Sequence, residues 1–326
     1  MKRRSLCRWS GAWALAPSIA GWAQVERPCK VAWVSVDQAG ARSPVFAAFR
    51  AGMAALGYVE GRNLTIDSWW GDGSTDKLAA MRGEILRSQP DVIVAQGGVA
   101  LGPMLHDSVK GPLVFSMSGD PVLAKIVASY SQPGGNRTGI TLFAADLIGK
   151  RLALLKEIVP AMRSIAVIGN PRHPGAPREV DASRAAAARL GLVQTYHPSA
   201  SQAELDSVLS GIARARIDAV LVLSDGFALN QAQRIAKFSV RERIPVVAGW
   251  ATFAQRGNLM AYGPEFADVH RRLASYVDRI RKGARPGDLP IEQPTKFELV
   301  INLKTARAMG ITIPQSLLLR ADEVIQ

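Results

Sequence analysis

Residues 112–143 read PLVFSMSGDPVLAKIVASYSQPGGNRTGITLF. The run at 113–116 is apolar without a helical period, which predicts a short buried strand. A polar loop follows, and Pro121 then begins a predicted helix with Asp120 at its N-cap. After a turn at 132–136 and a second predicted strand at 138–142, the alternation of strands and helices starts again. We interpret the stretch as the edge of one lobe, its ligand loop and the passage into a second lobe, because open α/β sheets bind small molecules at the carboxyl ends of their strands.

The composition fits two α/β lobes. The chain has 326 residues, 48% of them apolar, which is enough for two hydrophobic cores. The net charge is +13, but no basic run is interleaved with aromatic residues and no zinc-finger or helix-turn-helix spacing occurs, so we expect no nucleic-acid partner. The cysteines are Cys7 and Cys29. If the N-terminus is removed, Cys29 has no internal partner for a disulfide.

The N-terminus has the pattern of an export signal. Basic residues at the start precede a short apolar stretch at 11–22, and Gly21 and Ala23 form a small-x-small cleavage pattern before Gln24. Arg3-Arg4 is compatible with a twin-arginine signal, and a Sec signal is the other route. We therefore expect residues 1–23 to be a signal peptide and the mature protein to be periplasmic. The alternative is a disordered cytosolic tail.

The first predicted lobe alternates strands and helices as in a doubly wound parallel sheet. Predicted strands at 30–35, 63–70, 91–95 and 113–116 are separated by helices that begin near Pro44, Ser74 and Leu101. The strand ends would bring five residues to one edge: Ser35, Gln96, Gly97, Ser118 and Asp120. Each alone has an ordinary alternative as a cap or turn residue, but their convergence favours a ligand site.

The second predicted lobe repeats the scheme. Strands are expected at 164–169, 192–196, 219–223, 245–248 and 259–262, with helices at 146–159, 178–190, 202–214 and 230–241. Its ligand edge would carry Asn170, Asp225, Phe227, Trp250 and Tyr262. Trp250 follows a strand end directly, although an aromatic residue packed beneath a loop is the alternative.

The C-terminal part connects the two lobes again. An amphipathic pattern at 265–282 predicts a long helix that packs back on the first lobe, and 296–301 predicts a strand of the second. The chain would therefore cross between lobes three times, which forms a hinge. We assign residues 28–140 and 263–287 to lobe 1, and residues 141–262 and 288–326 to lobe 2. The predicted fold class is α/β, with two doubly wound, flavodoxin-like lobes.

The motifs of common enzymes are absent from the sequence. The four histidines show no paired metal spacing, and no G-x-S-x-G elbow is present. The glycines at 134–139 are not followed by the Lys-Ser/Thr of a P-loop, and Gln96-Gly97-Gly98 lacks the dinucleotide order. We therefore predict neither an enzyme nor a bound cofactor or metal.

The sequence resembles the ABC-transporter substrate-binding family of periplasmic proteins with the type I fold, whose members include tryptophan- and tyrosine-binding lipoproteins. The resemblance covers nearly the whole chain. It is carried most specifically by LPIEQPTKFELVIN at 289–302, RADEV at 320–324 and PGGNRTG at 133–139. Two departures occur: His173-Pro174-Gly175 stands where the family usually has a more acidic loop, and Ser224-Asp225-Gly226 replaces the usual Asp-Pro.

The resemblance implies a receptor that closes on a small solute and delivers it to an ABC permease and its ATPase. We expect an amino-acid-like ligand and a monomeric protein. Asp225 is the preferred counter-ion for an ammonium group, and Trp250, Phe227 and Tyr262 would enclose an apolar side chain. A ligand-sensing receptor for a membrane signalling protein, or an enzyme on the same scaffold, are the alternatives.

Overall fold

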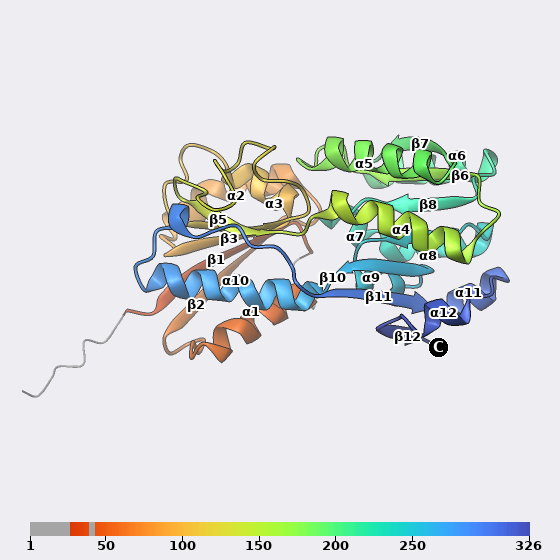
Figure 1. The fold of residues 1–326 in the computed structure, drawn as a ribbon. Coiled ribbons are helices and arrows are strands. Elements are labelled where there is room, and N and C mark those ends of the chain that lie inside the picture. The colour runs from red at the N-terminus through yellow and green to blue at the C-terminus, as the bar shows by residue number, and fades with distance from the viewer. Residues whose placement is uncertain (1–26, 39–42) are drawn as a thin grey trace, which may run out of the picture.

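The computed structural model describes residues 27–38 and 43–326, which form two α/β lobes side by side (Figure 1). The predicted signal peptide lies outside these residues. Within them, the first lobe has a five-stranded parallel sheet in the order β2-β1-β3-β4-β5. Its strands are β1 (Cys29–Ser35), β2 (Leu64–Trp70), β3 (Val92–Gln96), β4 (Leu113–Met117) and β5 (Arg137–Thr141).

The second lobe has a mixed sheet. In the described part of the chain it has seven strands in the order β12-β11-β10-β9-β8-β6-β7. The strands are β6 (Ser164–Gly169), β7 (Val193–Pro198), β8 (Ala219–Val222), β9 (Val246–Ala248), β10 (Met260–Pro264), β11 (Phe297–Asn302) and β12 (Glu323–Ile325). The β10–β11 pair is antiparallel, and the other pairs are parallel. Together the two sheets confirm the predicted fold class.

The helices of the first lobe include one from the distant C-terminal part. They are α1 (Pro44–Ala55), α2 (Thr75–Arg87), α3 (Gly98–Met104), α10 (Phe266–Arg281) and the 3₁₀ turn η1 (Pro286–Asp288). The amphipathic α10 packs along α1, as its pattern predicts, and buries Leu273, Tyr276 and Val277. The two helices approach closely at Gly52, where a Cβ atom would lie 2.6 Å from the Arg271 carbonyl oxygen.

The remaining helices cover the second sheet. They are α4 (Ala144–Ile158), α5 (Ala176–Arg189), α6 (Gln202–Arg214), α7 (Gly226–Asn230), α8 (Ala232–Glu242), α9 (Ala251–Gln255), α11 (Leu303–Met309) and α12 (Gln315–Leu318). Leu152 and Leu155 of α4 pack with Val167 of β6 and Leu221 of β8 in one buried cluster. Among the described residues we find no helix with the length and apolarity that a bilayer crossing requires.

The chain passes between the lobes at three crossings, which lie between β5 and α4, between β10 and α10, and between η1 and β11 (Figure 1). Backbone hydrogen bonds tie them together. The third crossing pairs with β5, since Thr141 N–H donates to the Glu292 carbonyl at 3.0 Å and Glu292 N–H donates to Gly139 at 3.1 Å. The second and third crossings meet where Glu265 N–H donates to Lys296 at 3.1 Å. The hinge is therefore a bundle of adjacent segments.

The predicted helix at Pro121 is wrong. The segment forms turns, with one helical-type hydrogen bond from Ala124 N–H to the Asp120 carbonyl, after which Lys125 has a φ of 55°. This conformation allows Ile126 and Val127 to pack into the core of the first lobe. Burial of these side chains outweighs the local helix signal.

Candidate functional site

The carboxyl edge of the first sheet carries a buried polar group. Ser35 at the end of β1 donates its hydroxyl to Gln96 Oε1 at the end of β3, at 2.9 Å, and both side chains are buried. Gly97 follows with a φ of 86° and is the N-cap of α3. Ser118, just after β4, is also buried. The structure therefore brings these four predicted residues to one edge.

Asp120 lies at the rim of that edge and contacts the other lobe. Its carboxylate accepts hydrogen bonds from the backbone N–H groups of Val122 and Leu123 and forms an ion pair with Arg178 of α5 at 2.5 Å. Burial acts to raise its pKa, but the Leu123 N–H, the Tyr130 hydroxyl and the arginine together hold the pKa below its usual value. Asp120 thus joins the lobes while it caps its own turn.

Asn170 and Asp225 lie at the carboxyl edge of the second sheet, after β6 and β8. Asn170 Oδ1 accepts from Arg172 N–H at 3.0 Å. Asp225 caps α7 by accepting from Ala228 N–H at 2.6 Å, and the Asn170 side chain also acts on its carboxylate, lowering its pKa against burial. Burial raises the pKa of Asp225 to about 6, so the carboxylate is mostly ionised at neutral pH.

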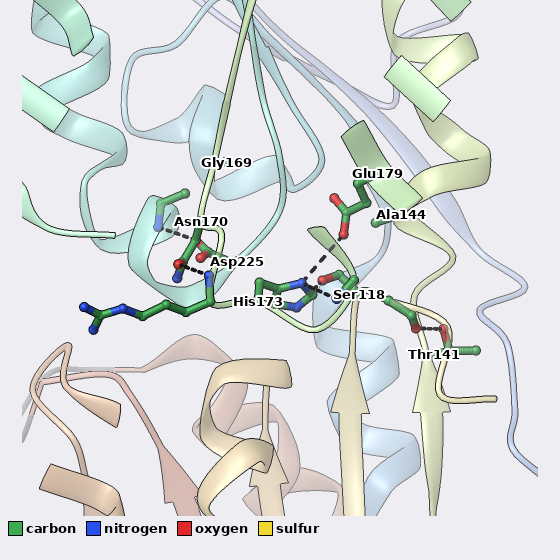
Figure 2. A network of polar contacts seen from close by, with 12 residues as sticks. Ser118, Thr141, Ala144, Gly169, Asn170, His173, Glu179 and Asp225 are labelled. Carbon is green, nitrogen blue, oxygen red and sulfur yellow. Dashed lines mark hydrogen bonds and ion pairs between the residues drawn. The ribbon is translucent and has the colours of Figure 1, made fainter. Parts of the chain in front are cut away.

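His173 enters from the loop after β6 and reaches the first lobe. Its Nε2 lies 2.9 Å from Ser118 Oγ, and its Nδ1 accepts from Gly175 N–H at 3.0 Å. Figure 2 shows the ring between Ser118 at the end of β4 and Glu179 of α5. Burial lowers the pKa of His173 to about 4, so the ring is neutral at pH 7.

The carboxyl group of Glu179 and the guanidinium of Arg151 are also buried near His173. Burial raises the pKa of Glu179 to about 8, against the opposing influence of Arg151. The Ser224 N–H and the Ser118 hydroxyl also act to lower this pKa, yet neither carboxyl oxygen has a hydrogen bond of ordinary geometry with a described residue. Arg151 is 0% exposed and donates to the carbonyl oxygens of Tyr262 at 2.8 Å and Ala144 at 3.2 Å.

The three predicted aromatic residues occupy separate surroundings. Trp250 is 4% exposed and stacks on Phe266 at the start of α10, with ring centroids 4.6 Å apart. Tyr262 stacks on Phe297 at 6.4 Å. Phe227 is half-buried on α7. Trp250 therefore packs across the second crossing, which fits the alternative of an aromatic residue packed beneath a loop.

A cavity of about 530 Å³ opens between the lobes, and none of the ten site residues predicted from the sequence is among the residues that line it. Its walls come from the start of α1, from α7 and α9, and from the second crossing. They carry the carboxylates of Asp37, Glu265 and Glu298 and the guanidinium of Arg256. A second, small cavity of about 10 Å³ lies beside Ser118 and Glu179. No cluster of three or more metal-ligating side chains occurs among the described residues.

The model of one protein family, the ABC transporter substrate binding proteins, matches residues 31–325. This chain belongs to that family. A curated relative, the tyrosine-binding protein of Clostridioides difficile strain R20291, is 22% identical over 255 residues, which are 78% of this chain and 73% of the relative.

Solved structures share the fold of this substrate-binding protein. A conserved domain protein from Vibrio cholerae is 27% identical, with a TM-score of 0.84 over 91% of this chain and 100% of the other. A domain from Streptococcus pneumonia, in complex with L-Trp, is 22% identical, with a TM-score of 0.84 over 91% and 100% of the two chains. A ligand-free, open substrate-binding protein from Clostridium difficile is 20% identical, with a TM-score of 0.64 over 91% and 99%. These likenesses confirm the type I binding-protein fold.

Sequence reasoning did not assign the residues that line the larger cavity of this substrate-binding protein, and it also missed His173, Glu179 and Arg151 between the lobes. His173 had a signal, because it follows the strand-end pair Asn170-Pro171 and departs from the family pattern. Glu179 and Arg151 gave none, because a charged residue on an amphipathic helix usually faces solvent.

Proposed function

We propose that this substrate-binding protein is the periplasmic receptor of an ABC import system, and that its two lobes close on a small, amino-acid-like ligand. The observation that carries the proposal is the interlobe cavity, which both lobes line. Its volume of about 530 Å³ falls within the range of roughly 300–1,000 Å³ that is usual for small-molecule sites. Lobes joined by several strands commonly close around a ligand by bending at the hinge.

The charges at the interlobe surfaces suit a zwitterion. An ammonium group would pair with a carboxylate, for which Asp225 is our candidate because it is a buried carboxylate after the end of a strand. A carboxylate would suit the backbone N–H groups at the strand ends or the Arg256 guanidinium. The ligands in the names of two relatives, tyrosine and L-Trp, support an amino acid. The ligand-binding residues predicted from the sequence stay a proposal for the strand-end edges outside the lining of this cavity: Ser35, Gln96, Gly97, Ser118, Asp120, Asn170, Asp225, Phe227, Trp250 and Tyr262.

We further propose that residues 1–23 direct export, and that the mature monomer delivers its ligand to a membrane permease driven by an ATPase. Such docking contacts are polar and transient, so charged loops at the rims of both lobes are suitable surfaces. The loop that begins at Arg172 is one such rim. A transport assay tests this proposal. We expect vesicles that contain the permease and the ATPase to take up labelled ligand only when the receptor is added.

A thermal-shift screen tests the ligand class. The purified protein is heated with each of the L-amino acids, and with sugars, nucleosides and simple carboxylates as comparison groups. A ligand that binds only the folded state raises the melting temperature as its concentration rises. We expect this with at least one L-amino acid. A clear shift with a sugar or nucleoside, and none with any amino acid, would overturn the proposed ligand class.

A further inference from the structure

Arg151 holds two of the three crossings. It lies on α4, and its Nη1 donates to the carbonyl of Ala144, which directly follows the first crossing. Its Nε donates to the carbonyl of Tyr262, which lies just before the second crossing. Glycine makes room for the guanidinium, since a Cβ on Gly249 would lie 2.7 Å from Arg151 Nη2. The arginine thus fixes the relative position of two segments that must bend when the lobes move.

Glu179 and His173 lie buried at the boundary between the lobes. Arg151 acts electrostatically on Glu179, whose Oε1 lies 3.9 Å from His173 Nδ1. That nitrogen accepts a hydrogen bond from Gly175 N–H, so in the neutral ring the hydrogen is on Nε2. Nε2 therefore donates to Ser118 Oγ across the interlobe boundary. The ring has the tautomer that this contact needs.

The lobes touch directly around His173. A Cβ on Gly98 of the first lobe would lie 2.6 Å from His173 Nε2. A Cβ on Gly119 would lie 2.6 Å from the Gly175 Cα, and a Cβ on Gly175 would lie 2.6 Å from the Gly119 Cα. Backbone meets backbone here, without space for a side chain. The His173–Ser118 bond therefore requires that the lobes touch at this point, and we call the arrangement in which they touch closed.

We propose that the His173–Ser118 hydrogen bond is a closure latch, and that the hinge arginine Arg151 fixes the two crossings on which its formation depends. The latch stabilises the closed arrangement through the protein's own side chains, so part of the free energy of closure does not come from the ligand. The inference rests on the proposed closure of the lobes and is independent of the ligand's identity. It makes His173 and Ser118 positioning residues.

Small-angle X-ray scattering of the ligand-free protein tests the latch. His173→Ala and Ser118→Ala each remove the hydrogen bond, whereas His173→Gln retains an N–H donor near the position of Nε2. Loss of the free energy that one neutral hydrogen bond contributes shifts the ratio of open to closed molecules roughly 2- to 12-fold. We expect a larger radius of gyration for both alanine variants and a radius near that of the wild type for His173→Gln. The double alanine variant should open no further than either single variant, because both remove the same bond.

The matched control is His106→Ala, which removes an exposed imidazole from the first lobe. It should leave the radius unchanged. Wild-type radii for both His173→Ala and Ser118→Ala would overturn the latch. Because no ligand is added, this outcome is distinct from failure of the amino-acid screen, which would leave the scattering result intact.

Arg151→Lys tests the connection to the hinge. Lysine keeps the positive charge but lacks the guanidinium fork that binds the two carbonyl groups at once. We expect the ligand-free radius to increase as it does in the alanine variants. A wild-type radius in Arg151→Lys would overturn the positioning role of the arginine.

Discussion

His270 is completely buried in the first lobe as a neutral ring. Its Nδ1 lies 2.7 Å from the Phe266 carbonyl oxygen, its Nε2 lies 3.5 Å from Ser116 Oγ, and Trp33 packs nearby. Burial lowers the pKa to about 4, although the Phe266 carbonyl acts to raise it. The unfolded chain takes up a proton near pH 6.5, whereas the folded protein does not. The contribution of the neutral His270 ring to the free energy of unfolding is therefore present above pH 6.5 and is lost as the pH falls toward 4.

Urea unfolding at pH 7 and pH 4.5 measures this loss, which we expect to be on the order of 2–3 kcal/mol from His270. His270→Gln lowers the free energy of unfolding at both pH values through lost packing. It should also reduce the difference in that free energy between pH 7 and pH 4.5. His173 titrates in the same window, so part of the difference should remain. The exposed His106→Gln serves as the control and should keep the wild-type difference. An undiminished pH difference in His270→Gln would contradict the prediction.

At the residue scale, the sequence predicted side chains at strand ends better than side chains on helices. Ser35 and Gln96 lie where the parallel sheet places them, because strand ends of one sheet share an edge. Arg151 is buried because its partners are the carbonyls of Ala144 and Tyr262, and the latter is 111 positions away in the sequence. Only the assembled hinge provides such partners. A local charge pattern therefore cannot indicate this burial.

At the element scale, the close approach of β9 and β10 beside the hinge depends on glycine. A Cβ on Gly263 would lie 1.7 Å from the Gly249 carbonyl oxygen, which is backbone and cannot rotate away. We expect Gly263→Ala to destabilise the protein by about 3 kcal/mol or more, measured by urea unfolding. Gly211→Ala in α6 is the control, because nothing lies within 4 Å of its added Cβ. It should raise stability by about 0.5–1 kcal/mol, and equal effects at both sites would refute the argument.

The local sequence pattern predicted some helices and strands correctly and others not. β6 and α6 have the predicted bounds, because a buried apolar run and a strong amphipathic period mark them. The five-residue α7 was missed, because its N-cap Asp225 was considered only as a ligand residue. The turns after Asp120 were predicted as a helix, because the Asp-Pro start is the same for both. Short elements depend on tertiary packing that a local pattern does not contain.

At the scale of the whole molecule, the two sheets present their carboxyl edges to each other, and the three crossings allow those edges to approach. The alternation of strands and helices was sufficient to predict this architecture. It could not predict which residues meet across the boundary, because contacts such as Asp120–Arg178 depend on the relative position of the two lobes. The ligand site is defined by the same relative position.

Asp225→Asn tests whether closure depends on a charged group in the second lobe. Asparagine retains an oxygen that can cap α7 but removes the charge proposed to hold an ammonium group. For an L-amino acid identified by thermal shift, we expect the affinity to fall at least roughly 10-fold, since breaking a buried charge pair is costly. The ligand should reduce the radius of gyration of the wild type, and this reduction should disappear in the variant at the same ligand concentration. Asp181→Asn, an exposed change on α5, should close as the wild type does. Because burial raises the pKa of Asp225 to about 6, wild-type affinity should also weaken below pH 6, where protonation removes the counter-charge. Normal closure by Asp225→Asn would exclude this carboxylate as the ammonium partner.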